Sequence, residues 1–318
     1  MDSSLRPMST SQLLDRTFHV YRANFLLCIG ISLIVPTLIL LVQLGFAFLG
    51  FRPNTRMAVS TESAIILGGT SFLLIITVST FGGAMAQGAT VFAVSRIHLG
   101  HSVTIGESYR QVLSRFGAVL AIFISVSLRT FAPYIPGGAV MAAGFVFLFP
   151  GTAGGASDAA VWFGLLMLGA LALLAAGVVG SLYLYARYAL AVPACVLEKT
   201  GASAALRRSS FLSKDSIMRI ILVFFLLGVL SAVFSTVLNL PAQIYSFQHR
   251  GILNTPMLVW GYAATFVARA IVGPVAAIAL ALIYYDQRVR KEAFDLQLLM
   301  QALEQTPPAP GAAAATIG

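Results

Sequence analysis

Six apolar segments, each long enough to cross a lipid bilayer, dominate this chain of 318 residues and restrict what it can fold into. A spanning helix needs about 20 mainly apolar residues, because each residue adds about 1.5 Å toward about 30 Å of hydrocarbon. Backbone polar groups in lipid must be satisfied within the segment, so we predict an all-α, polytopic membrane bundle. The expected spans are Phe25–Phe51, Ser63–Ser95, Phe116–Pro150, Ala159–Tyr188, Ile217–Leu240 and Met257–Tyr285.

Composition excludes a soluble domain. Apolar residues make up 58% of the chain and charged residues only 10%, whereas soluble domains have about 45–50% and about 25%. The first apolar run begins at Phe25, continues for 27 residues and is not followed by an A-x-A cleavage site. It is too long for the core of a signal peptide, so we expect it to remain as a membrane helix.

The third apolar segment admits two interpretations. Within it, RTFAPYIPGG (Arg129–Gly138) contains an arginine, two prolines and two glycines. One interpretation is a helix Phe116–Phe131, a break and a second short helix Gly138–Phe149; the other is a single kinked span. Broken backbone at membrane depth is tolerated only where protein or water covers it. We favour the break.

The positive charges predict the orientation. The chain has 20 Lys and Arg against 11 Asp and Glu, and 15 of the 20 fall on the side that holds both termini. Four fall on the other side, and Arg269 lies within the last span. Because cytoplasmic loops collect Lys and Arg, we expect both termini in the cytoplasm. The surplus therefore predicts topology and not a nucleic-acid partner.

The segments before the first, third and fifth spans are similar to one another. Ser11–Phe25 aligns with Ser102–Phe116 at an offset of 91, and Ala202–Ile220 is a looser third copy. The aligned pairs are Ser11 with Ser102, Leu14 with Ile105, Thr17 with Ser108, Phe18 with Tyr109 and Phe25 with Phe116. This pattern predicts three two-span units, at about residues 11–95, 102–188 and 202–285. Parallel repeats of this kind occur in transporters but do not by themselves imply transport.

Each of these segments is expected to be an amphipathic helix. The predicted apolar stripes are Leu14, Phe18, Tyr21 and Phe25 in the first copy, and Ile105, Tyr109, Val112 and Phe116 in the second. Two interpretations stay open: helices in the headgroup plane with arginines near lipid phosphate, or extensions of the spans packed on their neighbours. The candidate lipid- or partner-facing residues are Arg16, Arg22, Arg110, Arg115, Arg207, Arg208, Arg288 and Arg290.

The end of the chain divides into two parts. Residues 286–304 have apolar positions at spacings of three and four, which predicts an amphipathic helix suited to a membrane surface, to self-docking or to a partner helix. Residues 305–318 form a Pro/Ala/Gly tail that we expect to be disordered.

Three segments resemble a known family. They are LRPMSTSQLLDRTFHVYRANF (Leu5–Phe25), YARYALAVPACVLEKTGASAALRRSSFLS (Tyr185–Ser213) and ALIYYDQRVRKEAFDLQLL (Ala281–Leu299). Together they resemble bacterial membrane proteins related to the glycerophosphodiester phosphodiesterase membrane domain. The resemblance implies a polytopic helical fold in a bacterial plasma membrane. Some members of that family carry a soluble phosphodiesterase domain, which we do not find in this chain, so that activity does not transfer.

The sequence offers no catalytic constellation, so we expect no catalytic residue, no cofactor and no metal. His98 and His101 have the spacing of two metal ligands but no third ligand nearby. Nucleophile-elbow, Walker and dinucleotide-binding patterns are missing, and no two carboxylates share a span. Glu198 with Arg207 or Arg208 is interpreted as a surface ion pair worth about 0–1 kcal/mol.

Polar residues within the spans are the remaining candidates. Arg269 lies about 24 Å along its helix from Tyr285, near the outer leaflet, and Arg129 lies beside the proline-rich break. For both arginines, snorkelling or structural pairing is favoured over a ligand site. The expected roles of the other residues are interhelical hydrogen bonds for Gln43, Gln87 and Asn239, close packing for the span glycines, and kinks for Pro36, Pro193 and Pro274.

These features favour a non-enzymatic multi-pass membrane module whose partners are membrane lipids and, as a further option, a membrane or cytoplasmic protein. Three Arg-bearing amphipathic segments at equivalent places motivate this hypothesis. The alternative is a transporter or channel for a small or lipid-like solute, which would use the repeats, the third segment and the two intramembrane arginines. Whether Arg129 and Arg269 face a shared interior or separate lipid-facing rims distinguishes the two.

Overall fold

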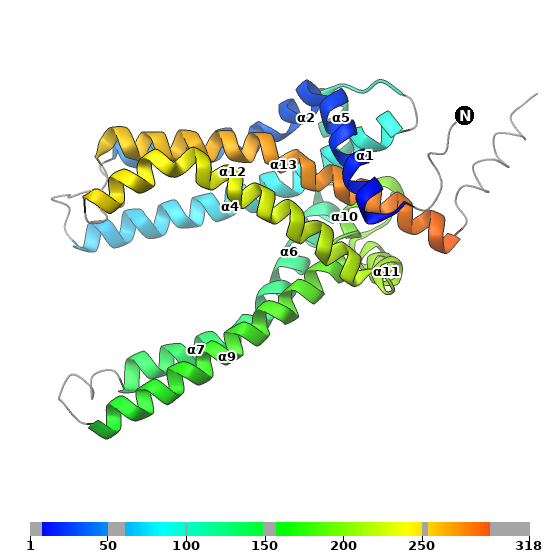
Figure 1. Ribbon diagram of the computed structural model, residues 1–318. Coiled ribbons are helices and arrows are strands. Elements are labelled where there is room, and N and C mark those ends of the chain that lie inside the picture. The colour runs from blue at the N-terminus through cyan, green and yellow to red at the C-terminus, as the bar shows by residue number, and fades with distance from the viewer. Residues whose placement is uncertain (1–7, 50–60, 99–100, 149–156, 250–253, 293–318) are drawn as a thin grey trace, which may run out of the picture.

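The computed structural model describes residues 8–49, 61–98, 101–148, 157–249 and 254–292, and every regular element in these ranges is a helix (Figure 1). The elements are α1 (Thr10–Ala23), α2 (Phe25–Ser32), α3 (Ile34–Phe48), α4 (Thr61–His98), α5 (Ile105–Leu113), α6 (Phe116–Phe131), η1 (Ala132–Tyr134), α7 (Ile135–Ala143), η2 (Gly144–Leu148), α9 (Ser157–Tyr188), α10 (Ala191–Leu197), α11 (Ala202–Ser213), α12 (Ile217–Gln248) and α13 (Thr255–Glu292). Five helical segments of the described chain are long and apolar enough to cross a membrane, or six with the bent pair α2–α3. The predicted all-α class is confirmed for the described residues, and the long apolar helices fit a multi-pass membrane protein.

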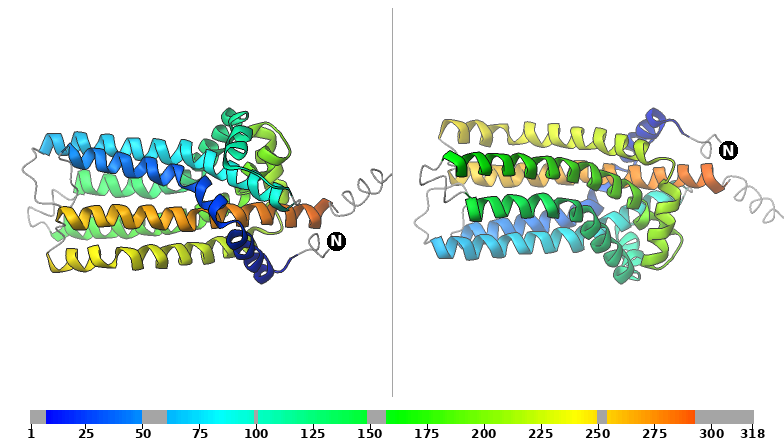
Figure 2. Two further views of the ribbon diagram at one scale, coloured as in Figure 1. Left: turned by 90° about the horizontal axis from the view of Figure 1, so that it is seen from above. Right: turned by 90° about the horizontal axis from the view of Figure 1, so that it is seen from below.

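The long helices meet at one end of the molecule and diverge toward the other. Helices α3, α4, α12 and α13 form one group, while α7 packs on α9 as a hairpin that leaves this group toward the far end (Figure 1). Views along the perpendicular direction show the long helices nearly side by side (Figure 2). The molecule is therefore a bundle with one splayed hairpin.

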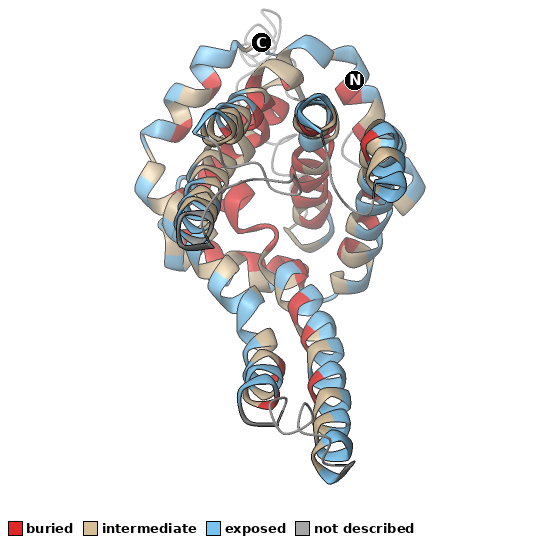
Figure 3. Cartoon of the chain, turned by 90° about the vertical axis from the view of Figure 1, so that its left-hand side faces the viewer, coloured by how far each residue is buried: buried red, intermediate tan, exposed pale blue. Residues whose placement is uncertain are grey.

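The buried core lies where the helices meet. Helix α10 is buried from Ala191 to Val196, and α13 is buried from Ala277 to Gln287 (Figure 3). The outer faces of the long helices instead carry exposed apolar side chains, of which Phe72 and Phe225 are each 64% exposed. In a bilayer such faces contact lipid tails, which are as apolar as they are, so no burial inside the protein is required.

Three short helices, α1, α5 and α11, lie around the end of the bundle that holds the core, and we call them the collar (Figure 1). Helix α1 begins with a reciprocal cap, in which the Ser9 Oγ accepts from the Gln12 N–H and the Gln12 Oε1 accepts from the Ser9 N–H. Thr104 caps α5 by accepting from the Glu107 N–H. Local sequence thus specifies where two of the three collar helices begin.

Each collar helix carries a hydroxyl side chain that donates a hydrogen bond to a backbone carbonyl of a neighbouring helix. The Tyr21 hydroxyl of α1 donates to the Ile271 carbonyl, and that of Tyr109 of α5 donates to the Ile31 carbonyl, at 2.7 and 2.6 Å. Ser209 and Ser213 of α11 both donate to the Arg187 carbonyl. These carbonyls lie before Pro274, before the 41° bend between α2 and α3, and before the α9–α10 break. These hydrogen bonds tie the collar to the neighbouring helices close to points where those helices bend, end or contain a proline.

The break that we favoured in the third segment is wrong, and the alternative of a single span is what the structure shows. Helix α6 ends at Phe131 as predicted, but η1 and α7 continue the helix, so that Phe116–Val146 forms one span. The second helix begins at Ile135 and not at Gly138. Pro133 and Pro136 lie in the first positions of η1 and α7, where a proline removes no intrahelical hydrogen bond. The 3₁₀ turn η1 and the first turn of α7 therefore accommodate the two prolines without ending the span.

The last span continues further than predicted. Helix α13 runs without interruption past Tyr285 to Glu292, with Pro274 inside it. The first residues of the predicted helix 286–304 are therefore the end of this span. Residues 293–304 and the predicted disordered tail 305–318 lie outside the described residues.

Candidate functional site

The eight candidate arginines of the sequence divide into two sets. Four are exposed and their side chains make no hydrogen bond or ion pair with another described residue: Arg16, Arg22, Arg110 and Arg207. All four belong to the collar. The other four, Arg115, Arg208, Arg288 and Arg290, bind groups within the chain.

An exposed apolar side chain follows an exposed arginine in each collar segment. The pairs are Arg22 with Leu26, Arg110 with Leu113, and Arg207 with Phe211, and the apolar members are 84%, 59% and 54% exposed. A spacing of three or four residues places the second and third pairs on one helix face. In the first pair, the α1–α2 junction at Asn24 lies between the two residues. The collar therefore presents charge and apolar surface side by side.

The predicted apolar stripe of α1 is displaced by one position. The buried residues are Leu13, Thr17, Val20 and Tyr21, while Leu14 and Phe18 are only partly buried against the core. Thr17 fits the core because its Oγ1 donates to the Leu13 carbonyl at 2.7 Å. A pattern that counts threonine as polar misplaces such a stripe.

Glu198 lies at the centre of a cluster that joins α10, α11 and α13. Its carboxylate accepts from the Arg208 Nε at 2.9 Å and from the Tyr284 hydroxyl at 2.5 Å. Glu292 accepts from the Arg208 Nη2 at 2.7 Å and from the Arg288 Nε at 3.1 Å. Burial alone would lower the pKa of Arg208, but the hydrogen bonds to Glu292 and Glu198 outweigh it and raise that pKa. The predicted surface ion pair is thus part of a half-buried network.

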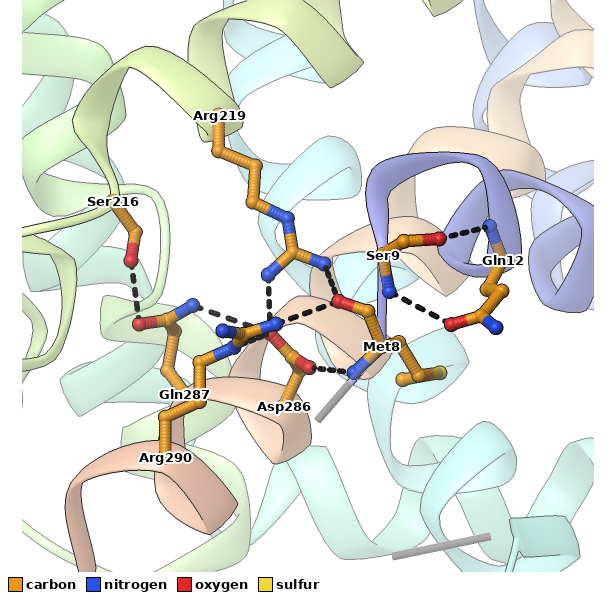
Figure 4. A network of polar contacts seen from close by, with 8 residues as sticks. All are labelled: Met8, Ser9, Gln12, Ser216, Arg219, Asp286, Gln287 and Arg290. Atoms are coloured by element: carbon orange, nitrogen blue, oxygen red, sulfur yellow. Dashed lines mark hydrogen bonds and ion pairs between the residues drawn. The ribbon is translucent and has the colours of Figure 1, made fainter. Parts of the chain in front are cut away.

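Asp286 lies at the centre of a second cluster, which fastens the start of α1 (Figure 4). Its fully buried carboxylate receives the Arg219 Nη1 at 2.5 Å and the Arg290 Nε at 2.8 Å. The same carboxylate accepts from the Met8 N–H, and both arginines donate to the Met8 carbonyl. Gln287 connects this cluster to Ser216, whose hydroxyl donates to its side chain. The sequence predictions missed this role, although the Asp286–Arg290 spacing is typical of a helical ion pair.

Arg115 has the simplest role of the four paired arginines. Its Nη1 donates to the Lys199 carbonyl at 2.6 Å, which ties the start of α6 to the α10–α11 connection.

Two neighbouring cavities lie between the long helices. The α6 cavity, of about 280 Å³, is lined by residues of α4, α6, α9 and α10 together with the Ala189 that links the last two. The α13 cavity, of about 290 Å³, is lined by residues of α2, α3, α4, α9 and α13. Gln87 of α4 and Tyr185 of α9 line both cavities. The sequence predictions did not single out Tyr185.

The two intramembrane arginines lie at these cavities. Arg269 lines the α13 cavity. Arg129 lies over the ring of Tyr188, 4.9 Å from its centroid, and Tyr188 lines the α6 cavity. Both arginine side chains are exposed; Arg269 forms part of the lining of the α13 cavity, whereas Arg129 only contacts a residue that lines the α6 cavity.

The interhelical hydrogen bonds expected of the span amides are not formed. The Asn239 amide donates to the Ser235 carbonyl of its own helix. Gln43 and Gln87 make no hydrogen bond with another described residue. The Gln87 amide is thus available to the two cavities.

The described residues hold no group of three or more His, Cys, Asp or Glu side chains that could bind a metal ion. His101 is exposed, and the His98 side chain lies outside what the structure describes. Comparisons of the chain with protein-family models, curated proteins and solved structures found no match. Function must therefore be argued from the collar and the cavities.

Proposed function

We propose that this chain is a non-enzymatic multi-pass membrane protein whose collar engages the anionic lipid headgroups of the cytoplasmic leaflet. In this proposal α1, α5 and α11 are the equivalent interfacial helices of three two-span units. Both termini are cytoplasmic, and the membrane is a bacterial plasma membrane, as the family resemblance implies.

The pairing of exposed arginine with exposed apolar side chains in every collar segment carries this proposal. An interfacial helix needs both, because the apolar side chain enters the acyl boundary while the cation contacts phosphate. Each Lys or Arg near an anionic surface contributes about 1 kcal/mol. The four unpaired arginines Arg16, Arg22, Arg110 and Arg207 together would contribute about 4 kcal/mol on this scale.

The distribution of the four arginines favours lipid over a protein partner. Arg16 and Arg22 lie on α1, Arg110 on α5 and Arg207 on α11, and these three helices lie at different places around the core end of the bundle (Figures 1 and 2). A continuous planar surface such as a leaflet can contact all of them at once. A single folded partner would contact one sector of the collar.

The lipid shell of the purified protein tests the proposal. The wild type and R16Q/R22Q/R110Q/R207Q are reconstituted in nanodiscs of mixed phosphatidylcholine and phosphatidylglycerol, and the lipids that remain bound on transfer to detergent are counted by mass spectrometry. We expect phosphatidylglycerol to be enriched around the wild type and close to its bulk fraction around the variant. The quadruple Arg→Lys variant keeps the charge and should keep the enrichment. Equal enrichment in all three would contradict a lipid-binding collar and favour a protein partner.

A second candidate function is transport of a small or lipid-like solute, and the two neighbouring cavities, one of them lined by Arg269, favour it. Movement of fluorescent phosphatidylglycerol between the leaflets of proteoliposomes tests the lipid version. A rate equal to that of protein-free vesicles would contradict it.

A further inference from the structure

We propose that the α13 cavity binds an acidic oxyanion group, a phosphate or carboxylate, carried by an amphiphile. Arg269 supplies the counter-charge, and Gln87 and Tyr185 supply hydrogen-bond donors. This site is separate from the collar, and its occupancy does not depend on the proposed function.

The charge of Arg269 has no counterpart in the protein. No aspartate or glutamate occurs within residues 16–61, 63–106, 159–197 or 216–285, which include every segment that lines the α13 cavity. The Arg269 side chain is exposed and makes no hydrogen bond or ion pair with another described residue. A cation within a membrane protein is costly unless an anion or water compensates it. A bound anion would supply the missing charge.

The polar groups of the cavity that remain uncommitted are donors. The Ser32 hydroxyl donates to the Ala270 carbonyl at 2.9 Å, and the Thr90 hydroxyl donates to the Ala86 carbonyl at 2.8 Å. The side chains of Gln87, Tyr185 and Arg269 make no hydrogen bond with another described residue. The guanidinium can only donate, and the amide and the phenol can donate as well as accept, so a ligand rich in acceptors can use all three groups. A phosphate or carboxylate meets this requirement.

The backbone around Arg269 is held in place by the same hydrogen bonds. Pro274 has no N–H, so the Ala270 carbonyl four residues earlier has no partner in its own helix. Ser32 of α2 replaces that partner, which joins α2 to the residue that follows Arg269. Pro36 and Pro274 both line the cavity. The α2–α3 bend and the proline of α13 thus both lie at the cavity, and the Ser32 hydrogen bond holds the backbone beside Arg269.

The rest of the lining indicates an amphiphile. Val35, Pro36 and Leu280 give the α13 cavity an apolar wall. Its volume of about 290 Å³ is at the lower end of ligand pockets, so it suits a headgroup better than a whole lipid. The α6 cavity, beyond Gln87 and Tyr185, includes Phe131, which is 68% exposed. A tail leaving the headgroup site therefore finds apolar side chains.

Binding of radiolabelled phosphatidylglycerol to the full-length protein in neutral maltoside micelles tests this site. R269Q removes the charge, Q87L removes one donor without changing charge, and R207Q is a control that loses the same charge on the collar. We expect R269Q to weaken binding by about tenfold or more, because the exposed Arg269 charge is only partly desolvated in the cavity. We expect about a tenfold loss for Q87L and no change for R207Q, while R269K retains most of the affinity.

The competitors identify the source of the oxyanion. Displacement by unlabelled phosphatidylglycerol but not by inorganic phosphate assigns the site to a lipid headgroup, and displacement by both assigns it to the oxyanion itself. If R269Q fails to fold, as judged by circular dichroism, Q87L decides. Wild-type affinity in both R269Q and Q87L, or equal binding of phosphatidylcholine, overturns the proposal. R16Q/R22Q/R110Q/R207Q should retain this binding, so failure of the collar and failure of the cavity are distinguishable.

Discussion

The Asp286 carboxylate accepts a hydrogen bond from the Met8 backbone N–H at 2.7 Å, across 278 positions of the sequence (Figure 4). Arg219 and Arg290 bind both partners, since each donates to the carboxylate and to the Met8 carbonyl. One buried charge therefore fastens α1 to α12 and α13. The position of the first collar helix depends on it.

Substitution D286N should destabilise the protein by about 2–3 kcal/mol. Breaking a buried ion pair typically costs about 3–5 kcal/mol because the remaining charges are left without a partner. The smaller value is expected here because Arg290 is 39% exposed. Thermal unfolding in detergent measures the loss, and hydrogen exchange should increase most in α1.

The matched control is D215N. Asp215 also pairs with a basic residue, Lys291 at 2.8 Å, but its side chain is 73% exposed. Exposed pairs contribute little, so the unfolding midpoint of D215N should stay at the wild-type value. Equal effects of D286N and D215N would show that the Asp286 cluster does not hold α1.

The sequence was sufficient to predict the long helices, because a segment can cross a bilayer when it is long and apolar enough, and both properties belong to the segment alone. It was not sufficient for the Asp286 cluster. Only Arg290 lies within helical reach of Asp286, whereas Arg219 and Met8 are 67 and 278 positions away. Contacts between residues so far apart in the sequence depend on how the helices pack, which composition does not specify.

The candidate sites divide in the same way. Sequence identified Arg129 and Arg269 because charges are rare in spans, but the shared wall of Gln87 and Tyr185 depends on how α4 and α9 pack. The eight candidate arginines could not be divided from the sequence into those that are exposed and those that bind groups within the chain. Arg207 and Arg208 are neighbours with the same chemistry, yet only Arg208 is directed at Glu198.

Substitution G177A should destabilise the protein by about 1–3 kcal/mol, the usual cost of overpacking. A Cβ at Gly177 would lie 2.9 Å from the Pro133 carbonyl oxygen, which is backbone and cannot move aside cheaply. On the same helix, G169A adds a Cβ that meets nothing within 4 Å. Because alanine is the better helix former, G169A should be neutral or slightly stabilising. A loss of the same size in both variants would contradict the close contact of η1 with α9.

Substitution S32A should cost about 1 kcal/mol, because it leaves the Ala270 carbonyl unsatisfied. In a P274A background the helix itself supplies an N–H to that carbonyl, so the cost of S32A should largely vanish. A double-mutant cycle on unfolding free energies measures this coupling. S210A removes a hydroxyl that hydrogen-bonds only to a carbonyl of its own helix, α11, and serves as the control. Additive effects of S32A and P274A would contradict the proposed compensation.

The depth of the collar in the membrane is the most direct measure of whether the collar binds lipid headgroups. A fluorophore is attached to Cys in the L113C variant, on α5, and to Cys in the L230C variant, midway along α12; the native Cys28 and Cys195 are buried. In proteoliposomes containing phosphatidylglycerol, we predict that a headgroup-attached nitroxide quenches the L113C label strongly, while only a deep acyl-chain nitroxide quenches the L230C label. Quenching of the L113C label by aqueous iodide alone would place the collar in water and contradict its binding to lipid headgroups.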